Sequence, residues 1–348
     1  MQPIEYAGRK QRQGQIASGP QPRNPVRLTD MYVEGEWMST FDPKSLIDLD
    51  ECVISALNLF ADPATEFPKP DLTQFKRSLV VGSGNAIATG RVIFDTMDAV
   101  FADEGGYQTK LDAIEGIDSV ILFSASGGKH APVIARDVKA RGRKIILFTC
   151  NPNALARGDV DECHVFPSRP EPYTYNTSTY MGMMMACRID DPKAEAKRTL
   201  EFIRNEVDPA LERSGKRLGD HDAFYLLVPE AFDLVRVMYA TKFVELFARR
   251  MARDVFTWEQ SKHATTVVET PGELFISFGR ENTSFGTERL HVPLPEDASY
   301  PAAMAVGYYV IGKLQKQKPD WFKQSIEGFA RRASEAFGQK IDPIVSFK

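Results

Sequence analysis

A short polar segment, residues 124–129, carries the residue types that bind a phosphate group. It reads Ser-Ala-Ser-Gly-Gly-Lys, follows the apolar run Ser119–Phe123, and precedes a stretch with helical spacing of its apolar residues. The free N–H groups of a first helical turn and the positive end of the helix dipole attract anions, and glycine lets the backbone approach them closely. A polar turn that only caps the helix is the simpler alternative. We predict a phosphate-binding loop, whose expected ligand contacts are Ser124, Ser126, Gly127 and Lys129.

A second glycine-rich turn, Gly82-Ser83-Gly84, follows the apolar run Ser78–Val81. Its residues could contact the same substrate, or they could begin a dinucleotide site for a nicotinamide cofactor. The dinucleotide fingerprint requires a third glycine, and Ile87 occupies that position. The substrate contact is therefore the favoured interpretation for Gly82, Ser83 and Gly84.

Alternating strands and helices must position both turns. Apolar runs at 78–81, 119–123, 144–149 and 162–166 alternate with helical patterns, the first of which is expected to reach about Phe101. This order predicts right-handed crossovers and a parallel sheet, which binds ligands outside the carboxyl ends of its strands. Both glycine-rich turns belong to that edge.

The second half of the chain repeats this pattern less completely. A long helix at about 192–213 precedes expected strands at 223–228 and 273–278, and about a dozen residues then separate Phe278 from Leu290, which is short for a helical crossover. We predict an α/β protein with two parallel sheets flanked by helices, the second sheet being smaller. The expected domains are a mobile arm at 1–30, a first domain with an N-terminal helix at 31–215, and a second, smaller domain with C-terminal helices at 216–348.

Composition limits the classes of partner. The chain has 348 residues and a net charge of −4, which gives no general attraction to nucleic acid or to an anionic membrane. No apolar run is long enough to span a bilayer, and the N-terminus lacks the apolar core of a signal peptide, so we expect a cytoplasmic protein. The four cysteines are scattered, without a Cys-x-x-Cys pair, and Cys163-His164 would need unidentified partners to hold a metal.

Three further segments have structural explanations that the residues alone leave open. Thr177-Ser178-Thr179 begin a predicted helix and could cap it. Glu245 lies in a predicted helix four residues before Arg249, in the order that favours an exposed ion pair. His263 follows a stretch with no clean helical period and could be an ordinary surface histidine.

Four of these features together resemble the sugar isomerase (SIS) domain, a phosphosugar-binding fold that occurs twice in the isomerase half of glucosamine-6-phosphate synthase. They are the glycine-rich turn at 82–85, the Ser-x-Ser-Gly loop at 124–129, Glu171 before the hydroxyl-rich helix start at 177–179, and Lys262-His263. The resemblance extends from about Phe75 to Lys313 and is stronger in the first half.

The resemblance implies a phosphosugar isomerase of the double SIS type that interconverts aldose and ketose through an enediol. It implies catalysis by Glu245 and His263, substrate contacts from Thr177, Ser178 and Thr179, no metal or redox cofactor, and a homodimer in which the histidine reaches the neighbouring subunit's site. Two alternatives stay open: a deglycase that forms a Schiff base with an amino sugar, and a phosphosugar sensor without catalysis. We do not expect a full synthase, because these 348 residues include no recognisable glutaminase domain to supply ammonia.

The sequence departs from the family pattern at three places. Lys129 replaces a threonine, which adds a positive charge to the expected phosphate loop. Ala264-Thr265 replaces the Gly-Pro that usually follows the histidine. The C-terminus does not reproduce the lysine-bearing tail of the synthase, so the role of that lysine cannot be transferred.

Overall fold

The computed structural model describes Asp42 and residues 45–215, 217–264, 268, 270–338 and 340–347, which belong to one compact unit, Asp42–Lys348. The arm expected at 1–30 lies outside these residues. Within the described part of the chain, every helix is too short or too polar to cross a membrane.

The first half forms a five-stranded sheet in which all neighbouring strands are parallel, as predicted. Its strand order is β2-β1-β3-β4-β5. The side chains of β1 and β3 are buried throughout, which explains their uninterrupted apolar sequences. The strands are β1 (Ser78–Val81), β2 (Ala99–Ala102), β3 (Ser119–Phe123), β4 (Lys144–Thr149) and β5 (Glu162–Val165).

One predicted boundary in this half is wrong. The helix expected to reach about Phe101 is α2 (Asn85–Ile93), and the residues beyond it form the edge strand β2. Ala99-Val-Phe-Ala pairs with β1 residue by residue. A short apolar run of this kind fits either a helix or a strand, and here pairing with β1 decides between them.

The second half forms a four-stranded parallel sheet, smaller than the first as predicted, with the order β10-β9-β7-β8. The connection from β9 to β10, residues 279–287, contains no helix. Strand β8 was not predicted, because Arg253 and Asp254 interrupt its apolar sequence at the edge of the sheet. The strands are β7 (Ala223–Val228), β8 (Ala252–Thr257), β9 (Glu273–Phe278) and β10 (Glu288–Val292).

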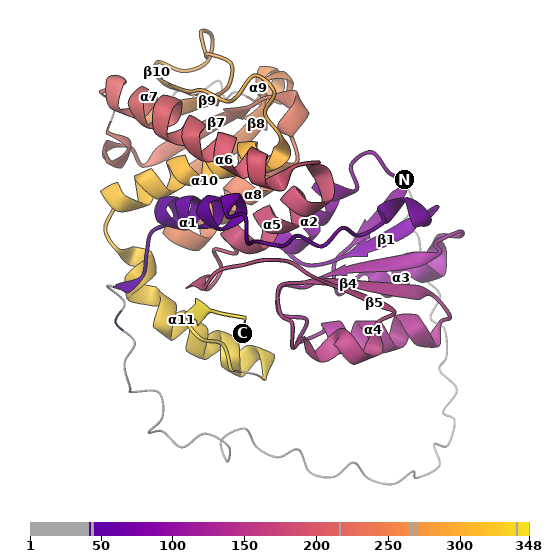
Figure 1. Cartoon of the computed structure of the whole chain (residues 1–348). Helices are drawn as coiled ribbons and strands as arrows, with labels where there is room; N and C mark the ends of the chain where they lie inside the picture. The colour runs from indigo at the N-terminus through magenta and orange to yellow at the C-terminus, as the bar shows by residue number, and fades with distance from the viewer. Residues whose placement is uncertain are drawn as a thin grey trace, which may run out of the picture. The chain divides into compact units, whose positions relative to one another are not determined.

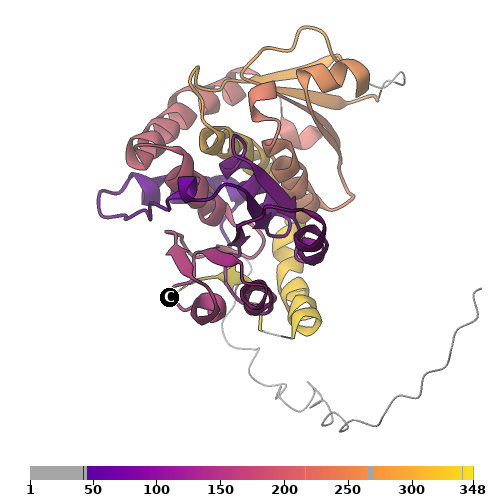
Figure 2. The same cartoon turned by 90° about the vertical axis from the view of Figure 1, so that its right-hand side faces the viewer.

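Helices separate the two sheets (Figures 1 and 2). Helix α1 (Leu49–Ala61) packs against α5 (Thr177–Arg188), α6 (Pro192–Phe202) and α10 (Tyr300–Gln317), while α8 (Val235–Phe247) packs against α2 and α10. Helix α10 is buried along most of its length. At Gly312 it approaches α1 so closely that a Cβ atom would lie 2.0 Å from the Asp50 nitrogen.

The remaining helices include the long one predicted at 192–213. It runs through α6, a single π-helical stretch at Ile203–Val207, and α7 (Asp208–Arg213), with Pro209 in the first turn of α7. Proline cannot donate to a preceding carbonyl, which accounts for the irregular turn before it. The other helices are α3 (Tyr107–Ala113), α4 (Ala131–Ala140), α9 (Trp258–Ala264) and α11 (Trp321–Phe337).

The C-terminal segment returns to the first half of the molecule. After α11, β11 (Ile344–Val345) pairs antiparallel with β6 (Glu171–Pro172), and Tyr173 N–H donates to the Pro343 carbonyl at 2.7 Å. In Figure 1 the chain end lies between α11 and α4. The tail is therefore next to the carboxyl edge of the first sheet.

Candidate functional site

A pocket of about 620 Å³ opens at the carboxyl edge of the first sheet. The register of β1 and β3 places Val81 beside Leu122, so the loops that follow these strands leave the sheet at the same edge. Helices α8 and α11 and the C-terminal segment supply the rest of the wall. Six of the predicted site residues line this pocket: Ser83, Gly84, Ser124, Ser126, Lys129 and Glu245.

The loop after β3 has the shape that its glycines predict. Gly127 has φ +59°, and a Cβ atom there would lie 2.4 Å from the Ala154 Cβ, so only glycine fits. The loop ends at the N-terminus of α4, whose second residue is Pro132. Gly127 and Gly82 are buried behind the loops and do not line the pocket. The pocket therefore faces a helix N-terminus together with the Ser124 and Ser126 hydroxyls, a combination that attracts anions.

Lys129 places a positive charge in the same pocket. The residue is half-buried and has φ +52°, an uncommon conformation for a side-chain-bearing residue. Its Nζ lies 3.2 Å from the Tyr173 hydroxyl and 4.1 Å from the ring centroid of Phe337. The two aromatic side chains hold the ammonium over the pocket through a hydrogen bond and a cation–π contact.

Glu245 pairs with a buried lysine that sequence reasoning missed. Lys242 has 0% exposure, and its Nζ lies 2.6 Å from Glu245 Oε2. The alternative pair with Arg249 is not found among the described residues, where Glu245 pairs with Lys242. The three-residue spacing on one helix was the only available sequence signal for Lys242.

Burial sets the protonation behaviour of this carboxyl. It raises the pKa of Glu245, while the Lys242 ammonium pulls the pKa part of the way back. A carboxyl whose pKa is raised toward neutrality can both accept and return a proton. Glu245 is thus the pocket carboxylate suited to acid–base chemistry.

Lys242 also holds a strained residue in place. Its Nζ donates to the Thr174 carbonyl at 2.6 Å, and Thr174 has φ +81°. A β-branched residue at positive φ is a backbone outlier and persists where the surroundings hold it. Thr174 lines the pocket, so one buried ammonium fixes both the carboxylate and this part of the wall.

Thr177, Ser178 and Thr179 lie outside the pocket and are buried at the start of α5. Glu171 accepts hydrogen bonds from the N–H groups of Thr177 and Ser178, at 2.8 and 3.4 Å, and from the Ser178 hydroxyl at 3.0 Å. Burial raises the pKa of Glu171, although these bonds lower it. The N-terminus of α5 is therefore already capped by a carboxylate of the chain itself.

His263 does not meet Glu245 within a single chain. It lies in α9, is exposed, and does not line the pocket. Glu259, on the same helix, pairs with Lys262 at 2.5 Å. Sequence order cannot reveal such a placement, because α9 follows the second sheet and the pocket belongs to the first.

The C-terminal tail is a part of the site that the sequence did not indicate. Residues Lys340, Asp342 and Ile344–Phe347 are among those that line the pocket. Lys340 Nζ lies 3.3 Å from Asp342 Oδ1. A lysine near the C-terminus therefore contributes to the wall, although the tail sequence differs from the family pattern. A two-residue strand such as β11 gives no periodic signal, which explains why it was missed.

No metal-binding cluster appears in the part of the chain that the structure describes, where no three His, Cys, Asp or Glu side chains are grouped to hold an ion. In the Cys163-His164 pair, Cys163 is half-buried and His164 Nε2 lies 3.4 Å from Glu162 Oε2. The lining of the candidate pocket offers hydroxyl, ammonium and carboxylate groups.

No protein family model and no curated protein matches this sequence. Several solved structures are similar to the fold. Glucosamine-6-phosphate deaminase from Thermotoga maritima is 16% identical, with a TM-score of 0.54 over 77% of this chain and 92% of that chain. The chain has the SIS fold.

Two other SIS structures agree with this result. The C-terminal domain of glucosamine-fructose-6-phosphate aminotransferase from Francisella tularensis is 11% identical, with a TM-score of 0.50 over 77% of this chain and 93% of that chain. The tagatose-6-phosphate ketose/aldose isomerase from Escherichia coli is 13% identical, with a TM-score of 0.50 over 76% of this chain and 86% of that chain. At these identities the likeness establishes the SIS fold alone.

Proposed function

We propose that this chain is a phosphosugar isomerase that interconverts an aldose and a ketose phosphate. One observation carries the proposal: Glu245 lines the same pocket as the serine-glycine loop, Ser124 and Ser126, at the N-terminus of α4. An anion site and an acid–base carboxylate in one cavity suit a substrate that has a phosphate at one end and a carbonyl carbon at the other.

The phosphate binds at the loop. Ser124 and Ser126 offer hydroxyl donors, Lys129 offers a charge, and the N-terminus of α4 adds its dipole. Anchoring the phosphate holds the sugar in one orientation, so that C1 and C2 face Glu245 instead of sampling the whole cavity.

The chemical step is a proton transfer between two carbons. Glu245 removes the proton from C2 of the aldose, the electrons move to the C1 carbonyl oxygen, and an enediol forms when that oxygen gains a proton from water in the open pocket. Glu245 then returns its proton to C1 as the C2 hydroxyl loses its proton and becomes the carbonyl of the ketose. Water takes up the proton that the C2 hydroxyl releases. Lys242 stabilises the ionised carboxylate before the first transfer.

Two buried oxygen atoms support a polyhydroxy ligand. Asn85 Oδ1 and Thr174 Oγ1 have no hydrogen-bond partner within the described residues, and both residues line the pocket. Buried polar atoms without partners are costly. Sugar hydroxyls can donate to both oxygens once small side-chain adjustments expose them.

We extend the proposal to a homodimer, in which His263 of one subunit assists ring opening in the site of the other. The exposure of His263 and its distance in the fold from its own pocket support this arrangement. The four free cysteines are compatible with a reducing compartment, and we propose the cytoplasm.

The test is proton exchange at C2 into heavy water with a panel of hexose and pentose phosphates. Exchange with at least one of them, lost in Glu245→Gln, supports the isomerase. Binding of every phosphosugar without exchange or conversion contradicts it.

A second candidate is a phosphosugar sensor without catalysis, favoured by the absence of His263 from its own chain's pocket. The same panel separates the candidates, because a sensor binds without exchange. Release of an amine from an amino-sugar phosphate would instead identify a deglycase.

A further inference from the structure

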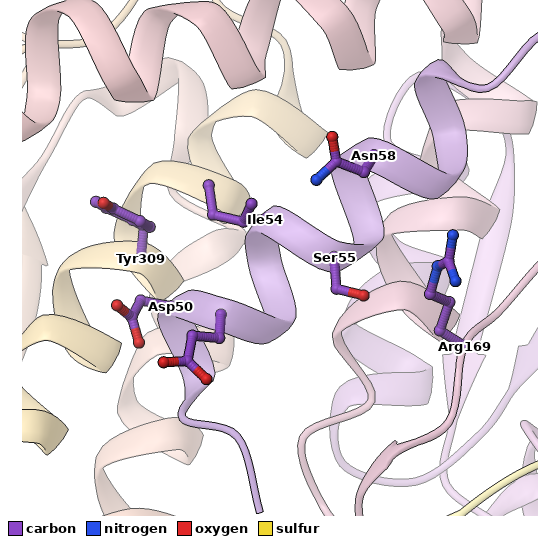
Figure 3. A pocket seen from close by; sticks show the side chains of 7 residues that line it. Asp50, Ile54, Ser55, Asn58, Arg169 and Tyr309 are labelled. Carbon is purple, nitrogen blue, oxygen red and sulfur yellow. The ribbon is translucent and has the colours of Figure 1, made fainter.

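A second pocket, of about 430 Å³, lies over helix α1 and shares no lining residue with the candidate substrate pocket. Its floor is one face of α1, with Arg169 on a facing loop and Tyr309 on α10 (Figure 3). The lining residues are Asp50, Glu51, Ile54, Ser55, Asn58, Arg169 and Tyr309.

One end of this pocket has more negative than positive charge. Lys316 Nζ lies 2.8 Å from Asp50 Oδ2 and 2.7 Å from Glu51 Oε1, so one ammonium serves two carboxylates. Asp50 is 3% exposed, and its other oxygen, Oδ1, has no hydrogen-bond partner among the residues that the structure describes. A buried carboxylate oxygen without a donor is costly. This end therefore favours a ligand with a positively charged hydrogen-bond donor.

Gly312 explains why Asp50 is so deeply placed. The glycine lets α10 approach the α1 backbone at Asp50, which puts the carboxyl between the two helices. Glu51 remains about half exposed, with a side-chain exposure of 48%. An incoming ammonium can therefore meet Glu51 first and then reach Asp50 as the partly exposed Lys316 side chain moves aside.

The other end of the pocket is positive. Figure 3 shows the Ser55 side chain directed toward Arg169, whereas Asn58 lies further along α1 with its amide turned away from Arg169. Arg169 is exposed, and no ion pair of its guanidinium occurs within the described residues. A guanidinium presents a planar pair of donors that matches a carboxylate. The Ser55 hydroxyl adds a polar group that can bond the same anion.

The spacing of the two ends limits the ligand. Ser55 and Asn58 lie four and seven residues after Glu51 on one helix, so these two positions are about 6–10 Å from Glu51 along the helix axis at a rise of about 1.5 Å per residue. Arg169 faces this part of α1, so we take the same range as the ligand length. Ile54 and Tyr309 lie between α1 and α10 and offer apolar surface. The Tyr309 hydroxyl donates to Asp208 Oδ2 at 2.6 Å, which fixes this wall.

We propose that the α1 pocket binds an elongated amino acid, in which an ammonium group at one end contacts Asp50 and Glu51 and a carboxylate about 6–10 Å away contacts Arg169. The site is separate from the candidate substrate pocket, so the proposal does not depend on the isomerase activity.

The experiment is calorimetric titration of the full-length protein with three probes of matched length. 6-Aminohexanoate carries both charges, hexylamine carries only the ammonium, and hexanoate carries only the carboxylate. We expect saturable binding of 6-aminohexanoate and affinities about tenfold or more weaker for the other two. Equal binding of hexylamine, or no binding of 6-aminohexanoate at millimolar concentration, overturns the proposal.

Two exposed substitutions locate the binding without disturbing the core. Arg169→Ala and Glu51→Gln should each weaken 6-aminohexanoate by about tenfold. Arg143→Ala, at an exposed arginine outside both pockets, and Glu245→Gln, in the substrate pocket, should leave the affinity unchanged. Unchanged binding in Arg169→Ala, or equal losses in all four variants, contradicts the assignment.

Discussion

Two hydroxyl-rich segments of this protein lie at helix N-termini and behave differently. Residues 124–129 precede α4 and open onto the substrate pocket, whereas residues 177–179 begin α5 and are buried. Residues 124–129 have two serine hydroxyls and residues 177–179 have one serine and two threonine hydroxyls, and hydroxyls of both kinds can contact phosphates. The difference is Glu171, whose carboxylate already occupies the donors of α5.

The comparison teaches that residue types at a helix start do not by themselves identify an anion site. A carboxylate of the chain can satisfy the same N–H groups that a phosphate would use. At α4, no carboxylate of the described residues bonds to the first turn in this way, and the Lys129 ammonium adds positive charge instead. Substitutions at Glu245, Ser178, Ser126 and Lys242 test this distinction.

The largest effect is expected from Glu245→Gln, which removes the acid–base group from the open pocket. General acid–base catalysis contributes about 10²–10⁴-fold, so C2 exchange should fall by that factor while phosphosugar affinity stays nearly constant. Exchange into heavy water and calorimetry measure the two quantities. Glu171→Gln is the matched control, because it makes the same change in the carboxylate that caps α5. A similar loss of C2 exchange in a folded Glu171→Gln protein would show that the two segments do not differ in function.

Ser178→Ala should reduce stability and leave phosphosugar affinity unchanged. Ser178 donates to Glu171 Oε1 at 3.0 Å and accepts from the Arg169 N–H at 3.0 Å. Removing a buried partner costs about 1–3 kcal/mol. Urea unfolding measures the loss of stability. A weakened phosphosugar affinity in a fully folded Ser178→Ala protein would show that residues 177–179 contact the ligand.

In contrast to Ser178→Ala, Ser126→Ala should weaken phosphosugar affinity and leave stability nearly unchanged. The residue lines the pocket, and within the described part of the chain its hydroxyl accepts one weak hydrogen bond, from the Gly128 N–H at 3.3 Å. Its removal should weaken phosphosugar affinity by about tenfold with little change in the unfolding free energy. An unchanged dissociation constant in titrations with the preferred sugar phosphate would contradict a phosphate site at this loop.

Lys242→Met should move the acid limb of the pH–rate profile. Glu245 must be ionised to accept a proton, so the rate falls as the pH drops through its pKa, which burial raises and Lys242 lowers. Without the ammonium the limb moves to higher pH. Arg249→Gln is the control and should leave the limb in place. A shift in the Arg249 variant alone would instead support the alternative, in which Glu245 forms an ion pair with Arg249.

The fold was largely predictable because its central strands are continuous apolar runs that end in glycine-rich turns. The edge strands were harder to predict from the sequence. The residues of β2 could equally end a helix, and β8 carries the charged residues Arg253 and Asp254. Both segments are recognised as strands only from their pairing with β1 and β7.

The candidate site was predictable only where its chemistry lies on a loop. The 124–129 segment could be found from its residue types, but Lys242 looks like any helical lysine until its complete burial is known. The burial of residues 177–179 depends on a hydrogen bond that the Ser178 hydroxyl donates to Glu171, seven residues away. Contacts of this kind have no periodic signature.

The pairing of β11 with β6 has a practical consequence for work with this protein. Because the last residues form part of the pocket wall, an affinity tag or reporter fused to the C-terminus would sit at the entrance and interfere with ligand exchange. Deletion of the chain from Ile344 onward would remove β11 and this part of the wall, which would make the cavity more accessible to ligands soaked into crystals.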